Sequence, residues 1–114
     1  MKPIFLGALA SAFLVIAGVS TAALAEDIKN FDLVIKDHKF IPQELEIPAN
    51  QKVKVTIKNQ DSTAAEFESH ELRREKVIQG NSQAVVFVGP LAPGRYPFFD
   101  EFNEATTKGT VVVK

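Results

Sequence analysis

Apolar and polar residues alternate along most of the chain from residue 31 onward, which is the pattern of strands that bury one face. The clearest example is Lys52–Lys58, where Val53, Val55 and Ile57 separate polar residues. Similar strand-like segments are Phe31–Lys36, Glu44–Ile47, Gln83–Val88, Gly94–Phe99 and Thr110–Val113. Because successive side chains of a strand point to opposite faces, these segments predict short strands that each bury one side.

Turn-forming residues separate the predicted strands at nearly regular spacing. These turns are Asp37-His38, Phe40-Ile41-Pro42, Pro48-Ala49-Asn50, Asn59–Ser62, Gln79–Ser82 and Gly89-Pro90. Many short strands separated in this way are typical of an antiparallel sandwich or barrel. No internal repeat and no low-complexity tract divides the chain, so the sequence predicts one all-β domain.

Segment 64–79 is ambiguous, because its composition suits a helix by propensity and a strand by context. Its few large apolar residues form no continuous helical stripe. We therefore expect an extended piece at Glu66–His70, then a loop, and then a short strand at Lys76–Ile78.

The beginning of the chain has the three parts of a secretory signal peptide. Met1-Lys2 is a short basic head, Ile4–Val19 is apolar, and Ala23-Leu24-Ala25 is a small-residue cleavage site. The sequence therefore predicts a signal peptide at residues 1–25 and a single exported, periplasmic domain at residues 26–114. The alternative is an uncleaved N-terminal anchor, which the short apolar run disfavours.

Composition excludes several classes of function. The chain has no cysteine, so it forms no disulfide and offers no thiolate nucleophile or site for a lipid anchor. Its formal net charge of −1 gives no electrostatic footprint for nucleic acid. It also lacks a Gly-x-Ser-x-Gly turn and a glycine-rich phosphate loop. A hydrolase function is therefore disfavoured.

The segment Leu91–Tyr96 has the pattern of a tyrosine corner, Leu-x-Pro-Gly-x-Tyr. In that motif the Pro-Gly pair turns the chain between two sheets, and the tyrosine hydroxyl bonds back to the backbone just upstream. Greek-key sandwiches use this device. The alternative is a core tyrosine whose hydroxyl meets solvent.

Asp100 is the first sign of a site. Counting by two along the pleat places Tyr96, Phe98 and Asp100 on one side, so a face with two aromatic rings ends in a carboxylate. A carboxylate at the rim of a core is costly unless a cation or a hydrogen-bond donor meets it. The alternative role for Asp100 is to cap the local backbone.

The chain resembles the cupredoxins over FDLVIKDHKFIPQELEIPANQKVKVTIKNQD and GPLAPGRYPFFDEFNEATTKGTVVVK. More narrowly, it is similar to cupredoxin-like proteins of periplasmic ferrous-iron uptake systems over EFESHELRREKVI and YPFFDEFNEATTKG. These relatives are the FtrB-like proteins and the cupredoxin domain of EfeO-type proteins. The resemblance implies a Greek-key β-sandwich whose metal chemistry lies where the Asn59–His70 connection meets the Asp100–Lys108 loop.

The resemblance also implies which residues replace the copper ligands. Asp100 stands where a blue-copper cupredoxin has its cysteine, and Asn103 stands where a histidine follows. Thr107 corresponds to the axial methionine and Glu66 to the upstream histidine. The iron-uptake members commonly have Asp-Glu-Phe-His where this chain has Asp-Glu-Phe-Asn. A type 1 copper centre needs the thiolate, which this chain lacks.

Oxygen ligands are nevertheless abundant in these two segments. The candidate metal ligands are Glu66, Glu68, His70, Asp100, Glu101 and Asn103. Carboxylates with one imidazole suit iron, Mn(II) or Cu(II), and an anionic cluster favours the ferric over the ferrous ion. The alternative is that the mixed-charge run Glu71–Glu75 is a solvated surface and that His70 is simply exposed.

The resemblance implies a periplasmic protein of high-affinity iron uptake, with an iron or copper ion as cofactor. Such a protein would bind Fe(II), with ferroxidase-like oxidation as a further activity. Its partners would be a P19-like periplasmic metal-binding protein and a membrane iron permease. Two other hypotheses remain: a Cu(II) or Mn(II) carrier without redox turnover, and a metal-free cupredoxin scaffold that binds a partner.

Overall fold

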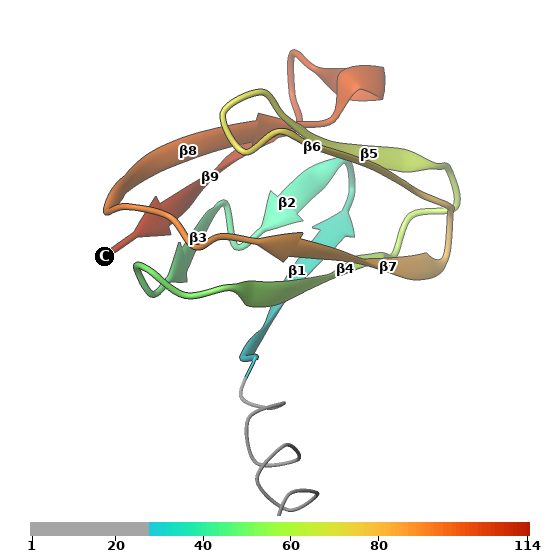
Figure 1. Cartoon of the computed structure of the whole chain (residues 1–114). Helices are drawn as coiled ribbons and strands as arrows, with labels where there is room; N and C mark the ends of the chain where they lie inside the picture. The colour runs from blue at the N-terminus through green and yellow to red at the C-terminus, as the bar shows by residue number, and fades with distance from the viewer. Residues whose placement is uncertain (1–27) are drawn as a thin grey trace, which may run out of the picture.

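The computed structural model describes residues 28–114, so the predicted signal peptide lies outside the described residues. These residues form two β-sheets packed face to face (Figure 1). The strands are β1 (Asn30–Lys36), β2 (Lys39–Ile41), β3 (Glu44–Ile47), β4 (Val53–Asn59), β5 (Ala65–Ser69), β6 (Arg74–Ile78), β7 (Ser82–Val88), β8 (Gly94–Phe99) and β9 (Lys108–Val113). The predicted all-β sandwich is confirmed.

The core lies between the sheets and follows from the alternation of side chains. In β4, Val53, Val55 and Ile57 are buried, whereas Lys54 and Lys58 point to the outer face. The other members of the core are Leu33, Ile35, Phe40, Leu45, Ile47, Ala65, Phe67, Leu72, Ile78, Val86, Val88, Phe98, Val111 and Val113. Among residues 28–114 the first member of this core is Leu33, so a chain that starts at residue 26 contains every member named above.

The sheet topology differs from a purely antiparallel sandwich. One sheet has the order β2-β1-β4-β7, and the other has the order β3-β9-β8-β5-β6. Two of the pairs are parallel, β1 with β4 and β3 with β9. Neither pair is joined by a hairpin, because the chain changes sheet between β2 and β3 and again between β3 and β4, and this leaves both pairs free to be parallel.

The tyrosine corner is present as predicted. The chain crosses from β7 in one sheet to β8 in the other through Gly89–Pro93. The hydroxyl of Tyr96 then donates a hydrogen bond to the carbonyl oxygen of Ala92 at 2.8 Å. This bond fixes the start of β8 and therefore the position of the loop that follows its end.

Two elements differ from the sequence prediction. Phe40-Ile41 belongs to the short strand β2, where Phe40 packs edge-on against Phe98 in the core. The ambiguous segment forms a hairpin of β5 and β6 that is longer than predicted, because its second strand begins at Arg74. Arg73 adopts a left-handed conformation in the turn, with a φ of 54°.

Candidate metal centre

The β5–β6 hairpin places three glutamates on the outer face of its sheet. Successive side chains of β5 alternate, so Ala65 and Phe67 enter the core while Glu66 and Glu68 point away from it. Glu75 on β6 stands directly opposite Glu68 in the register of the pair. Like charges opposite one another destabilise a strand pair, so a positive charge between them would stabilise the hairpin.

The loop between β8 and β9 brings a fourth glutamate over this face. The loop forms the short 3-10 helix η1 (Glu101–Asn103), which lies above the β5–β6 end of the upper sheet (Figure 1). One oxygen of Asp100 accepts hydrogen bonds from the backbone amides of Phe102 at 2.9 Å and Glu66 at 3.1 Å. These bonds tie η1 to β5 and hold Glu101 beside Glu66 and Glu68.

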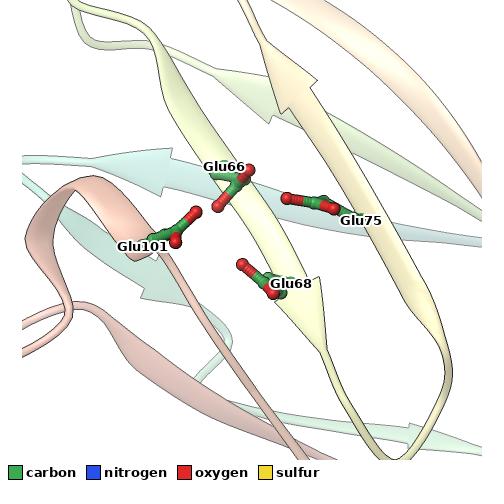
Figure 2. A group of neighbouring side chains, drawn as sticks. All are labelled: Glu66, Glu68, Glu75 and Glu101. Carbon is green, nitrogen blue, oxygen red and sulfur yellow. The ribbon is translucent and has the colours of Figure 1, made fainter.

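The four carboxylates converge on one point (Figure 2). One oxygen from each of Glu66, Glu68, Glu75 and Glu101 lies within 4.8 Å of one oxygen from each of the others. No salt bridge found among residues 28–114 involves any of the four. Opposite oxygen ligands of an ion with metal–oxygen distances of about 2.0–2.6 Å are about 4–5 Å apart. The spacing therefore fits one cation.

Glu66 is the member of the cluster that most clearly lacks a partner. Its side chain is 3% exposed, and its Oε1 atom is buried without a hydrogen-bond partner. The Oε1 atom of Glu68 is also buried and unpartnered. A buried carboxylate oxygen without a donor carries the full cost of its lost hydration. A proton or a cation at this point removes that cost.

Burial raises the pKa of the Glu66 carboxyl from 4.5 to about 8, and the neighbouring carboxylates of Glu75, Glu101 and Glu68 add to the rise. Both burial and surrounding negative charge disfavour the ionised form of a carboxyl, and each therefore raises its pKa. The free site therefore keeps a proton to a higher pH than an ordinary carboxyl does, and a cation that binds there must displace that proton.

Asp100 has a different role from the four glutamates. It is 1% exposed, and one of its oxygens accepts the two backbone hydrogen bonds that hold η1 to β5. It is not a member of the group of converging carboxylates. The backbone pairing of β5 with β8 is limited to Glu68 and Phe99. Beyond that pair, the hydrogen bond from the Glu66 amide to the Asp100 side chain connects β5 to the chain that follows β8. Asp100 therefore positions the site.

The other predicted ligands lie outside the converging group. His70 follows the end of β5, is exposed, and has its ring 5.5 Å from the ring of Phe99. Asn103 closes the η1 turn, where its carbonyl oxygen accepts hydrogen bonds from the amides of Thr106 and Thr107. The Thr107 hydroxyl donates to the carbonyl oxygen of His38 at 2.6 Å. The structure thus brings together three of the predicted residues, Glu66, Glu68 and Glu101.

Glu75 is the member of the cluster that sequence reasoning missed. It falls in the mixed-charge run Glu71–Glu75, whose composition is typical of a solvated surface. The signal that identifies it is the register of the hairpin, which pairs Glu68 with Glu75 and Ser69 with Arg74. Arg74 lies near the cluster but does not neutralise it, because its guanidinium donates to the backbone carbonyl oxygens of Phe87 and Arg73.

Comparison with known proteins shows which family the chain belongs to. The sequence matches the Cupredoxin-like domain family over residues 8–113. The chain belongs to the cupredoxin-like family. The chain is also similar to the uncharacterized protein RP394 of Rickettsia prowazekii (strain Madrid E), with 39% identity over 88 residues, which span 77% of this chain and 70% of that protein.

Solved structures share the cupredoxin fold at low sequence identity. The metal-binding domain of the Cu(I)-exporting P-type ATPase CopA of Streptococcus pneumoniae D39 gives a TM-score of 0.67 at 16% identity, over 76% of this chain and 86% of that one. Auracyanin A, a blue copper protein of Chloroflexus aurantiacus, gives 0.64 at 15% identity, over 77% of this chain and 100% of that one. These similarities confirm the Greek-key sandwich of the cupredoxins.

The residues present do not fit a type 1 copper centre. The sequence has no cysteine to supply a thiolate. The residues that the resemblance aligns with the cysteine and the methionine, Asp100 and Thr107, are engaged in hydrogen bonds that hold the η1 loop. The four glutamates offer only oxygen, which suits hard cations. The donor set therefore differs in kind from that of a blue-copper cupredoxin.

Proposed function

We propose that this cupredoxin-like protein binds an iron ion through Glu66, Glu68, Glu75 and Glu101 and delivers it for uptake across a membrane. The observation that carries the proposal is the buried, unpartnered oxygen of Glu66 within a cluster of four carboxylates. Such a site stabilises an ion of high charge more than one of low charge. It therefore favours Fe(III) over Fe(II).

Iron chemistry at this site consists of binding followed by oxidation. Fe(II) enters and displaces the proton of Glu66, and the carboxylates then stabilise the ferric product. Each Fe(II) gives up one electron, and dioxygen is the oxidant in the test described below: four Fe(II) ions and four protons convert one O2 to two water molecules. The carboxylates act by holding charge in place, since electrostatic stabilisation of developing charge is a major catalytic effect. From the family resemblance we also propose that the protein is exported to the periplasm. Its partners there would be a periplasmic metal-binding protein and a membrane iron permease.

The alternative within the same site is a Cu(II) or Mn(II) carrier without redox turnover. Its support is the family itself, because structural relatives include a blue copper protein and a domain solved with Cu(I). Carboxylate oxygens also bind Mn(II) well, and Cu(II) binds tightly to most oxygen and nitrogen sites. A cupredoxin scaffold that binds a partner without a metal is the remaining possibility.

Anaerobic titration of residues 26–114 with Fe(II), Mn(II) and Cu(II) tests these alternatives. We expect one Fe(II) per chain, followed by faster formation of ferric absorbance in air than in protein-free buffer. Glu66→Gln should weaken binding at least about tenfold, because even the loss of a residue that only orients a metal ligand costs that much. Glu71→Gln is the matched control, because Glu71 is an exposed neighbour outside the cluster, and it should leave binding unchanged.

The outcomes distinguish the proposals. Tight binding without faster oxidation would support a carrier, and stronger binding of Cu(II) with no affinity for Fe(II) would assign it to copper. No binding of any of the three ions would leave only the metal-free scaffold. Equal affinities for wild type and Glu66→Gln would reject the four-glutamate site.

A further inference from the structure

The outer face of the β2-β1-β4-β7 sheet carries positively charged side chains, whereas the metal centre carries negatively charged ones. Side chains at alternate positions of these strands point away from the core, and the strand registers bring them onto one surface. We call this surface the basic face and define it by Lys36, Lys39, Lys52, Lys54 and Lys58. Asp32, paired with Lys58 at 3.2 Å, is the one carboxylate in these four strands.

Large apolar side chains are exposed on the same basic face. Ile41 is 50% exposed at the β2 edge, and Phe87 is 41% exposed at the β7 edge. Val85 lies beside Thr56 and is 36% exposed. The ammonium group of Lys52 stands 4.9 Å from the centre of the Phe87 ring. Lysines and isolated apolar side chains therefore alternate across an exposed sheet.

We propose that the basic face docks on an anionic lipid surface. Lysines within a few ångströms of anionic headgroups each strengthen binding by about fivefold, and neighbouring apolar side chains enter the headgroup boundary. An acidic protein is the weaker candidate, because protein interfaces are depleted in lysine and enriched in arginine. Arg73 and Arg95 lie away from this face, and Arg74 reaches only its β7 edge, where the guanidinium donates to the backbone carbonyl oxygen of Phe87.

Docking through the basic face would also orient the metal centre. The two sheets present their outer faces in opposite directions (Figure 1). With the basic face on lipid, the face that carries Glu66, Glu68 and Glu75 points toward water. The proposal needs no metal at that centre, so it stands or fails independently of the proposed function.

Sedimentation of residues 26–114 with lipid vesicles tests the proposal. We expect binding to vesicles of phosphatidylglycerol and phosphatidylcholine but not to phosphatidylcholine alone, with weaker binding as salt rises. Replacing Lys36, Lys52 and Lys54 with glutamine should lower the partition coefficient about a hundredfold. The control replaces three lysines outside the face with glutamine, and it should retain most of the binding. These control lysines are Lys76, Lys108 and Lys114.

A fluorescent reporter locates the docking face directly. The sequence has no tryptophan, so Phe87→Trp introduces a single probe on the basic face. Its emission should shift to the blue on anionic vesicles. Phe102→Trp places the probe on η1, where Phe102 is 54% exposed, and its emission should not shift.

Several results would overturn the proposal. The first is the absence of binding to anionic vesicles at low salt. The second is a blue shift of the Phe102→Trp probe without a shift of the Phe87→Trp probe, because that result would assign docking to the η1 end. Retention on a polyglutamate resin without vesicle binding would assign the face to an acidic protein. A concentration-dependent dimer in ultracentrifugation that the triple lysine variant abolishes would assign it to a second copy of the chain.

Discussion

Replacing Glu66 with glutamine should make the stability of the metal-free domain nearly independent of pH across the neutral range. Glu66 is buried among Glu68, Glu75 and Glu101, and no basic group in residues 28–114 forms a salt bridge with it. In the wild type a proton on Glu66 removes the negative charge at the buried end of the cluster. Glutamine has the same shape and cannot ionise.

The magnitude follows from the pKa of Glu66, which rises from 4.5 to about 8 in the folded state. A carboxyl whose pKa is higher in the folded than in the unfolded state stabilises the fold below its unfolded pKa. That stabilisation is lost as the pH rises through the folded pKa. Each unit of pKa difference corresponds to about 1.4 kcal/mol, so ionisation of Glu66 costs at most about 5 kcal/mol of unfolding free energy.

Other shifted groups do not interfere in this pH window. The pKa of Asp32 is lowered, first by its hydrogen bond from Asn30, and the pKa of Asp61 is lowered, first by the backbone amide of His38. Their stabilisation is complete above the unfolded value of 3.8 and is lost only as the pH falls through the folded pKa. The pKa of Lys114 is raised by Glu46, so its contribution is constant below 10.5.

The assay is thermal unfolding of residues 26–114 in chelator between about pH 5 and about pH 9. With pKa values of 4.5 and about 8, the loss between these two pH values is at most about 4 kcal/mol. Each kcal/mol lost lowers the Tm of a domain of this size by about 4–8 °C. The wild type and the control Glu104→Gln should show a fall of this order, and Glu66→Gln should not. Saturating Mn(II) should abolish the fall in the wild type, because the cation replaces the proton. Equal pH slopes in wild type and Glu66→Gln would refute the reasoning.

Three further substitutions test the surroundings of the site. Asp100→Ala should destabilise the domain by about 3 kcal/mol in denaturant titrations, because the buried amide of Glu66 and the half-buried amide of Phe102 lose their acceptor. An unchanged midpoint would contradict its positioning role. Tyr96→Phe should cost about 1 kcal/mol by removing the bond to Ala92, measured in the same way. His70→Ala should leave cation affinity unchanged in calorimetry, since His70 lies outside the converging group, and a large loss of affinity would restore it as a ligand.

Much of the fold could be predicted from the sequence, because its signals are local. Val53, Val55 and Ile57 alternate with polar residues, and this alternation indicates a strand that buries one face. The Pro-Gly-x-Tyr segment carries its own turn and its own hydrogen bond. The parallel pairs of β1 with β4 and β3 with β9 could not be read locally, because they depend on where the chain changes sheet.

The candidate site was predictable in part for the same reason. Glu66 and Glu68 share a face because they are two residues apart, which alternation alone requires. Glu75 joins them through the register of a hairpin whose turn places Arg73, not a glycine, in a left-handed conformation. Asp100 aligns with a metal ligand in sequence but accepts backbone hydrogen bonds in the structure. That distinction depends on the path of η1, which no local pattern encodes.

The most direct test of the four-glutamate site is a crystal structure of residues 26–114 grown with Mn(II), with anomalous data collected at the manganese edge. The account predicts one anomalous peak surrounded by oxygens of Glu66, Glu68, Glu75 and Glu101 at about 2.2 Å. Crystals saturated with Mn(II) that show no peak among these carboxylates, or a peak bound instead by Asp100 or His70, would contradict it.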